Sequence, residues 1–244
     1  MHLHDHPAVR PPIGFAHRGG RSGLNLGWLR LGSRGGHAEN TAPAFLHALR
    51  RGASALESDL WRTADGVAVL RHDGEVDGRR VRELTRAELP ADSLSLPELY
   101  ASCGTDFNLS LDVSDPAAFP AAIAAAEHAG AAGRIWLVGE WPIGCHWRAS
   151  AGPDAHLVAG LSFRRLIGDF EGRLAAIRAT GTCAVNMPDW QWSRSRVAAV
   201  HAAGLLGFGW RANTPWQIDR LAELGCDGIY SDSVSALQRA TTPV

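Results

Sequence analysis

Residues 55–73, ALESDLWRTADGVAVLRHD, combine an acidic pair with a turn and a histidine. Glu57 and Asp59 stand two residues apart in an apolar run, and side chains at i and i+2 of a strand point to the same face. Two carboxylates held that close need a cation or a proton between them. The Asp65–Gly66 pair predicts a tight reversal that brings His72 alongside. This stretch therefore predicts a short β-unit with a hard-cation site beside a titratable imidazole.

Strand and helix patterns alternate on both sides of this stretch. Upstream, residues 13–17 predict a first strand, and residues 41–52 predict a helix with Thr41 as N-cap and Gly52 at its end. Downstream, the same strand-then-helix rhythm recurs without a domain-breaking linker. Further strands are expected at residues 107–113, 134–139, 156–160, 182–186, 205–211 and 228–230, and further helices around residues 96–103 and 116–130, near Trp141, Gly168, Ser193 and Thr214, and after Ser233.

About eight such units predict an α/β fold of the (β/α)8 TIM-barrel type. The length of 244 residues is normal for one barrel, so we expect residues 1–244 to form a single domain. Residues 1–11 are then a flexible N-terminus, and the glycine-rich residues 21–37 are an inserted loop or lid. A doubly wound nucleotide-binding sheet is the alternative, but residues 17–20, HRGG, lack the GxGxxG spacing of its phosphate turn.

The composition indicates which kinds of binding partner and which cellular location to expect. A net charge of −1 gives no electrostatic argument for nucleic acid or an anionic membrane as the main partner. No run approaches 18 apolar residues and the N-terminus has no apolar signal core, so we expect no integral membrane segment and a cytoplasmic location. The cysteines are widely spaced without a CxxC pattern, which predicts reduced thiols at positions 103, 145, 183 and 226. The oligomeric state stays open.

Polar residues gather at the predicted strand ends, where barrel proteins carry their chemistry. Each of these residues is a weak signal alone, because one histidine or one acidic pair at a strand end is commonly structural. Together they predict carboxylates, two histidines and an arginine on one rim. They are His17, Arg18, Glu57, Asp59, His72, Asp112, Trp210 and Asn213, joined by Glu39 and Asn40 from the loop before the first helix.

Five segments resemble the glycerophosphodiester phosphodiesterase family, which belongs to a phosphodiesterase superfamily with a barrel fold. The segments are FAHRGG (15–20), AENTAPAF (38–45), GASALESDLWRTADGVAVLRHD (52–73), GLLGFGWRAN (204–213) and GCDGIYSD (225–232). The resemblance implies metal-dependent hydrolysis of a small glycerophosphodiester to glycerol 3-phosphate and an alcohol. It also implies that His17 and His72 are the acid–base pair.

The residue chemistry supports the same division of roles. Glu57, Asp59 and Asp112 are oxygen ligands suited to Mg²⁺ or Ca²⁺, which would neutralise charge on a phosphodiester. Histidines titrate near neutral pH and suit proton transfer. For the remaining roles we expect Arg18 to bind phosphate as a planar fork, Glu39 to support His17 or Arg18, and Asn40 and Trp210 to contact substrate.

The sequence departs from the family at the end of the strand expected at residues 107–113. The family there has Glu-x-Lys, whereas this chain has Asp112 and Ser114. Asp112 is still a hard oxygen ligand, but Ser114 cannot supply the charge of a lysine. No lysine occurs anywhere, because all 24 basic residues are arginines. Arg211 is a candidate replacement, although strand alternation is expected to turn it away from the face of Trp210.

Four features leave alternatives open. The leucine-bearing insertion and Asp112 favour a phospholipase-D-like activity on lysolipids or sphingolipids, and Ser114 favours a non-catalytic phosphodiester-binding barrel. The insertion itself either caps the site or is a tolerated surface loop. The tryptophans at or beyond strand ends either form aromatic walls for a cationic head group or pack beneath loops. They are Trp141, Trp147, Trp190, Trp192, Trp210 and Trp216.

Overall fold

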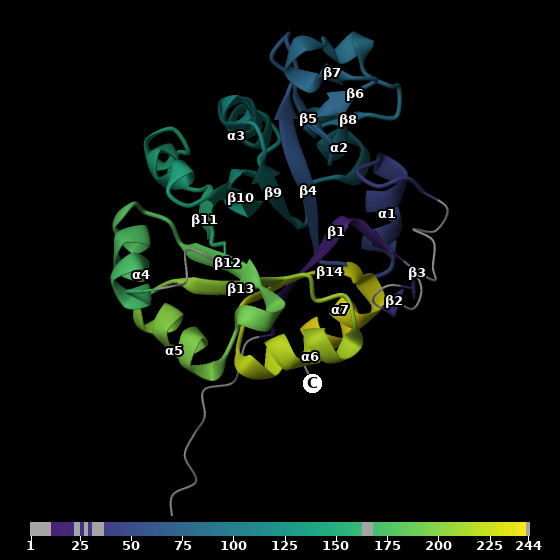
Figure 1. The fold of residues 1–244 in the computed structure, drawn as a ribbon. Helices are drawn as coiled ribbons and strands as arrows, with labels where there is room; N and C mark the ends of the chain where they lie inside the picture. Colours follow the sequence, from purple (N-terminus) through teal and green to yellow (C-terminus); the bar gives the residue numbers. More distant parts are fainter. Residues whose placement is uncertain (1–10, 22–24, 27–28, 31–36, 163–167, 243–244) are drawn as a thin grey trace, which may run out of the picture.

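Eight parallel strands close into a barrel in the computed structural model, which describes residues 11–242 apart from 22–24, 27–28, 31–36 and 163–167 (Figure 1). Closure comes from the first strand, which pairs with both the last strand and the second. The strands, in chain order, are β1 (Ile13–Arg21), β4 (Ala55–Arg62), β9 (Asn108–Val113), β10 (Ile135–Glu140), β11 (His156–Gly160), β12 (Ala184–Pro188), β13 (Leu206–Trp210) and β14 (Gly228–Ser233). The predicted (β/α)8 barrel is confirmed.

Helices surround this barrel in the order that the alternating pattern predicts (Figure 1). They are α1 (Ala42–Arg50), α2 (Leu96–Cys103), α3 (Phe119–His128), α4 (Phe170–Ala179), α5 (Arg194–Ala202), α6 (Pro215–Leu224) and α7 (Val234–Thr241). Single 3₁₀ turns accompany them at η3 (Pro116–Ala118), η4 (Ala132–Arg134) and η7 (Asp189–Gln191). None of the helices in the described ranges is both long and apolar enough to cross a membrane.

One predicted helix is wrong in type. The segment after β10 forms the 3₁₀ helix η5 (Ile143–Ala149) in place of the α-helix expected near Trp141. Pro142 and Gly144 explain the difference, because both residue types have low α-helix propensity. The predicted N-cap of α1 is confirmed: the Thr41 side chain accepts a hydrogen bond from the backbone N of Ala44 at 3.4 Å.

The strand β4 continues beyond the barrel and builds a small antiparallel extension. It pairs with β5 (Ala68–Leu70), which pairs in turn with β8 (Leu94–Ser95). The predicted reversal lies at Asp65–Gly66, where Gly66 has a φ of +89°. A second hairpin, β6 (Glu75–Val76) with β7 (Arg79–Arg80), and the 3₁₀ helices η1 (Val81–Glu83) and η2 (Arg86–Glu88) complete this region. It lies at the top of Figure 1.

The inserted segment is described only in part. Residues 25–30 contain an antiparallel pair, β2 (Asn25–Leu26) with β3 (Leu29–Arg30), and β1 runs on to Arg21. The described residues of the insertion contain no helical turn. Whether residues 21–37 act as a lid lies outside the described residues, as does the predicted flexibility of most of residues 1–11.

Strand alternation divides the apolar residues into a core inside the barrel and a core between the barrel and its helices. The inner core contains Phe15, Ala55, Trp136, Val138, Val158, Ala184, Phe208 and Tyr230. Its rings pack closely, with the centroids of Phe15 and Tyr230 4.6 Å apart. The outward residues form the larger clusters against the helices. The barrel interior is therefore filled, and inward-facing polar groups gather at the ends of the strands.

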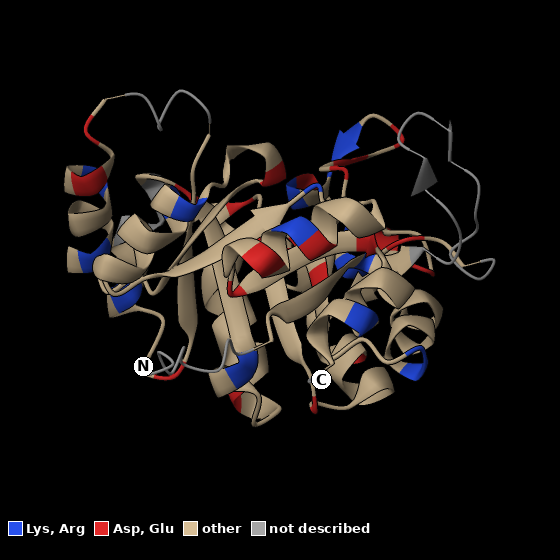
Figure 2. Ribbon diagram, turned by 90° about the horizontal axis from the view of Figure 1, so that it is seen from below, with Lys and Arg blue, Asp and Glu red and all other residues tan. Residues whose placement is uncertain are grey.

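The surface carries charges of both signs, in keeping with the net charge of −1, and the cysteines described in the structure are unpaired. In Figure 2 acidic and basic residues are interspersed over the visible helices. Cys103, Cys183 and Cys226 are free, and burial raises the pKa of Cys226 to about 12 and that of Cys103 to about 11. These thiols are therefore protonated and poorly reactive near neutral pH. The side chain of Cys145 lies outside the described part of the structure.

Candidate active site

The carboxyl ends of the eight barrel strands each place one inward-facing residue at the mouth of the barrel. Each lies two positions beyond an inner residue of the same strand, as His17 lies beyond Phe15 and Glu57 beyond Ala55. All eight line one cavity of about 660 Å³. We call them the mouth ring: His17, Glu57, Asp112, Glu140, Gly160, Asn186, Trp210 and Asp232, from β1, β4, β9, β10, β11, β12, β13 and β14 respectively.

The three carboxylates predicted from the sequence come together on β4 and β9. Glu57, Asp59 and Asp112 each offer an oxygen within 4.8 Å of the others, and the strand register places Asp59 beside Asp112. Their proximity follows from alternation on β4 and from parallel pairing with β9. They form a candidate metal site.

The ionisation of these carboxyls shows that the cluster needs a compensating charge. Burial, with the neighbouring carboxylates, raises the pKa of Glu57 well above its ordinary value. Burial and the charge of Asp59 raise the pKa of Asp112 to about 7, and burial also raises the pKa of Asp59. Oxygen ligands that resist ionisation without a cation fit a hard divalent ion such as Mg²⁺ or Ca²⁺.

Arg18, in β1, contacts two of these three carboxylates. Its backbone N donates to Oε2 of Glu57 at 3.1 Å, and its Nε donates to Oδ2 of Asp59 at 3.1 Å. Its guanidinium also lies 3.7 Å from Oε1 of Glu39. The backbone of Arg18 is in the left-handed region, with a φ of 52°. This turn is what brings both the backbone N–H and the side chain to the carboxylates.

His17 is held by a residue that our sequence analysis did not assign. Its Nδ1 lies 2.9 Å from Oδ1 of Asp232 in the next strand of the barrel. Its Nε2 lies on the other side of the ring, 3.8 Å from Oε2 of Glu57. The backbone N of Asp232 donates to Oδ1 of Asn213 at 2.9 Å, which fixes the strand end. Alternation from Tyr230 would have pointed to Asp232.

His72 reaches the cavity from outside the barrel, just after β5. Its Nδ1 lies 2.8 Å from Oδ1 of Asp73, and its side chain is 48% exposed. The predicted hairpin therefore brings a second histidine to the wall that holds His17. The proton-transfer roles of the two histidines stay predictions.

Asn40 lies beside the cavity but is not part of its lining. Its Oδ1 accepts a hydrogen bond of 2.8 Å from Oγ of Ser58, and both residues are buried. Its backbone N donates to the carbonyl of Arg18 at 3.3 Å. Asn40 thus joins the loop before α1 to the end of β1, and its predicted contact with substrate stays a prediction.

Comparison with known proteins agrees with this geometry. The family model described as "Glycerophosphoryl diester phosphodiesterase family" matches residues 17–128, which contain both histidines and all three carboxylates. Over these residues the chain is similar to the glycerophosphodiester phosphodiesterase family. It is thereby classed with the phosphoric diester hydrolases.

Individual similar proteins extend the match over most of the chain. A Mycobacterium tuberculosis protein named "Probable glycerophosphodiester phosphodiesterase 2" is 26% identical over 230 residues, which are 82% of this chain and 83% of that protein. A crystal structure from Silicibacter pomeroyi has a TM-score of 0.78 at 23% identity, over 97% of this chain and 94% of that one. An Oleispira antarctica phosphodiesterase, solved with the product sn-glycerol-3-phosphate, has a TM-score of 0.73 at 17% identity, over 94% and 96%.

A second arginine lies at the cavity. Trp210 and Arg211 both line it, as does Ser114. The expectation that Arg211 turns away from the face of Trp210 is wrong. The strand β13 ends at Trp210, and Arg211 has a φ of 65°, so alternation no longer sets its direction.

Two tryptophan rings hold the Arg211 guanidinium. Its Cζ lies 5.2 Å from the ring centroid of Trp210 and 5.9 Å from that of Trp190. The described residues provide no carboxylate partner for Arg211. Its charge is therefore available to an anion in the cavity, whereas that of Arg18 is already engaged.

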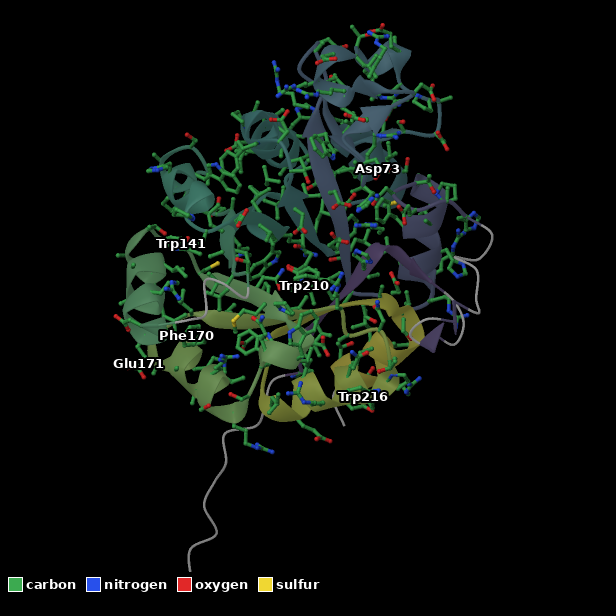
Figure 3. All side chains as sticks on the ribbon, viewed as in Figure 1. Asp73, Trp141, Phe170, Glu171, Trp210 and Trp216 are labelled. Carbon is green, nitrogen blue, oxygen red and sulfur yellow. The ribbon has the colours of Figure 1, made fainter. Side chains whose placement is uncertain are left out.

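Some of the other tryptophans are packed inside the protein, and others are exposed to solvent. Trp192 is fully buried, and its Nε1 donates to the carbonyl of Phe208 at 3.1 Å. Trp147 packs against Phe119, with centroids 4.9 Å apart. Figure 3 places Trp210 near the centre of the barrel and Trp216 at its periphery. Packing thus accounts for Trp147 and Trp192, while Trp210 forms part of the cavity wall.

Proposed function

We propose that the protein hydrolyses glycerophosphodiesters to glycerol 3-phosphate and an alcohol. The observation that carries this proposal is the position of two histidines and a carboxylate cluster at one cavity of about 660 Å³. The product sn-glycerol-3-phosphate held by the Oleispira antarctica relative supports the substrate class. The cavity is large enough for a small diester.

The carboxylates would hold Mg²⁺ or Ca²⁺ through Glu57, Asp59 and Asp112. A divalent ion bound there neutralises charge on the non-bridging phosphate oxygens. Arg18 and Arg211 supply further positive charge from two sides of the cavity, one beside the carboxylates and one from the opposite part of the mouth ring. Arg211 takes the place of the charge that Ser114 lacks, because both residues line the same cavity.

The two histidines transfer the protons. In each, Nδ1 lies within hydrogen-bonding distance of a carboxylate, Asp232 for His17 and Asp73 for His72. This contact favours the proton on Nδ1 and leaves Nε2 to exchange a proton with substrate. One histidine accepts a proton from the attacking water as its oxygen bonds to phosphorus, and the other donates a proton to the oxygen of the leaving alcohol as its P–O bond breaks.

The decisive experiment compares wild type with His17→Ala on glycerophosphocholine, with Mg²⁺ or Ca²⁺ and with a chelator. We expect chelator-sensitive release of glycerol 3-phosphate, and a rate about 10²–10⁴-fold lower in the variant. His201→Ala is a matched control, because Nε2 of His201 also lies 2.9 Å from an aspartate, Asp227, at the other end of the barrel. Equal rates in wild type and His17→Ala would exclude the mechanism.

The alternatives have less support from the described residues. The non-catalytic alternative depended on a missing positive charge near Ser114, and Arg211 places one at the same cavity. The lysolipid alternative depended on the insertion, whose leucine side chains lie outside the described part of the structure. Cleavage of lysolipids without cleavage of water-soluble glycerophosphodiesters would favour that alternative.

A further inference from the structure

Asn186 is a buried amide at the cavity without a hydrogen-bond partner. Its residue is 7% exposed, and its Oδ1 has no donor within reach. The described residues also provide no acceptor for its Nδ2. In either orientation of the amide, both polar ends lack a protein partner. Buried amides in folded proteins are nearly always paired, so this group requires a partner from outside the chain.

The position of Asn186 follows from strand alternation on β12. Ala184 belongs to the inner core, whereas Val185 and Met187 pack outward against the helices. Asn186 is thus the next inward residue and the mouth-ring member of β12. In the closed barrel β12 lies four strands from β4 in both directions. Asn186 therefore lies across the mouth from Glu57 and the carboxylate cluster.

The ring members beside Asn186 leave room for a ligand and offer a further acceptor. Gly160, on the adjacent β11, has no side chain, and a Cβ there would meet no atom closer than 3.5 Å. Glu140, on β10, lines the cavity and has no partner among the described residues. This part of the mouth ring thus offers a carboxylate, an unpaired amide and open space between them.

We infer that Glu140, Asn186 and the space above Gly160 bind a hydroxyl-bearing group of the substrate. A hydroxyl both donates and accepts, so it pairs with an amide and with a carboxylate. An ammonium group only donates and would leave Nδ2 of Asn186 unpaired, and a quaternary ammonium would leave both ends unpaired. This inference rests on the proposed function and names the part of the diester that this side of the cavity selects.

The hydroxyls belong to the glycerol that stays on the phosphate or to the alcohol that leaves, and two pairs of substrates separate these sources. Glycerol 4-nitrophenyl phosphate and methyl 4-nitrophenyl phosphate share a leaving group and differ in the glycerol hydroxyls. Glycerophosphoinositol and glycerophosphocholine share the glycerol and differ in the hydroxyls of the leaving alcohol. For each pair, the measured quantity is kcat/KM for the diester with the additional hydroxyls divided by kcat/KM for the diester without them.

Asn186→Leu should lower one of these two ratios about tenfold, the loss expected for an uncharged hydrogen bond in a buried site. A change in the first ratio assigns the site to glycerol, and a change in the second assigns it to the leaving alcohol. Gly160→Val, which fills the space instead of removing the amide, should lower the same ratio. Two unchanged ratios in both variants would overturn the inference.

Asn108→Leu is the matched control for Asn186→Leu. Asn108 is also an inward amide, but it lies at the opposite end of the barrel, where its Oδ1 accepts from Nε1 of Trp136 at 3.0 Å. Its variant should leave both ratios at the wild-type value even if it lowers stability. A matching change in Asn108→Leu would show that the effect of Asn186→Leu is general destabilisation and would overturn the inference.

A binding measurement keeps this inference separate from the proposed function. If wild type hydrolyses none of the four diesters, the proposed function fails, and calorimetry with glycerol 3-phosphate and methyl phosphate still tests the site. Asn186→Leu should then weaken glycerol 3-phosphate about tenfold relative to methyl phosphate. Equal weakening of both ligands, or of neither, would overturn the inference.

Discussion

Nδ1 of His17 lies 2.9 Å from Oδ1 of Asp232, across the pair of neighbouring strands that closes the barrel. The contact fixes the orientation of the imidazole and leaves Nε2 directed to the carboxylate side of the cavity. Asp232 is therefore a positioning residue for His17. Its own backbone is held by Asn213, so the contact belongs to the end of β14 and not to a side chain alone.

Asp232→Asn should lower kcat about 10–100-fold, the usual effect of losing a carboxylate that orients a histidine. KM for glycerophosphocholine should change little, because Asp232 acts through His17, and Asp232→Glu should recover part of kcat. Asp227→Asn removes the same kind of contact from His201 at the other end of β14 and should leave kcat unchanged. A KM effect without a kcat effect would assign Asp232 to substrate binding instead.

The raised carboxyl pKa values predict how pH affects the metal-free protein. Between the ordinary value of about 4 and a pKa of about 7, folded Asp112 keeps a proton that the unfolded chain has released. Since the folded state then binds more protons, the free energy of unfolding falls as pH rises from 5 to 8. Glu57 and Asp59 add to this trend, because their pKa values are raised as well.

Thermal unfolding with and without Mg²⁺ or Ca²⁺ tests this trend. The ion should raise the Tm more at pH 8 than at pH 5, because binding requires ionised carboxylates. Asp112→Asn should lessen both the loss of stability at pH 8 without metal and the gain with metal. Equal stabilisation by the ion at both pH values would contradict the assignment of this metal site.

Moving the positive charge within the cavity tests the role of Arg211. Arg211→Gln should lower kcat/KM about 10²-fold, as expected when one cation that stabilises the transition state is lost. Adding Ser114→Lys to Arg211→Gln should recover part of that loss, because both positions line the cavity. Arg239→Gln, at an exposed position of α7, is the control and should have no effect. Undiminished activity in Arg211→Gln would remove the arginine from the proposal.

Ser58→Ala tests the link between β4 and the loop before α1. Ser58 is fully buried, and its loss leaves Oδ1 of Asn40 without a donor, beside an Nδ2 that already lacks a partner. The variant should lose about 1–3 kcal/mol of unfolding free energy in urea denaturation. Ser102→Ala, on the exposed side of α2, should stay within about 0.5 kcal/mol of wild type. Similar values for both variants would contradict the structural role of this hydrogen bond.

The sequence predicted those parts of the fold and site that depend on local patterns. Alternation around Ser58 placed Glu57 and Asp59 on one face, and the Asp65–Gly66 turn placed His72 near them. Both predictions follow from the geometry of a single hairpin. The barrel followed from the repeated strand-then-helix pattern, which does not depend on contacts between distant residues.

The missed residues depend on relationships between strands or on the point where a strand stops. Asp232 meets His17 only because β14 pairs with β1, a contact across 215 positions of sequence. Alternation within β12 turns Asn186 inward, but its place across the mouth from Glu57 depends on the order of the strands in the closed barrel. The predicted side-chain direction of Arg211 was wrong because it assumed strand alternation at a residue that lies beyond β13, in the left-handed turn that ends the strand.

The mouth ring also separates catalytic chemistry from substrate selection, so that evolution and design can change the two independently. Four adjacent strands, β14, β1, β4 and β9, form one arc that carries the histidine, its aspartate and the acidic cluster. The opposite arc holds Glu140, Gly160 and Asn186, and none of these three is a metal ligand or a proton donor in the proposed reaction. Point substitutions in the second arc can therefore change which hydroxyl-bearing substrates are accepted while the first arc keeps its chemistry intact.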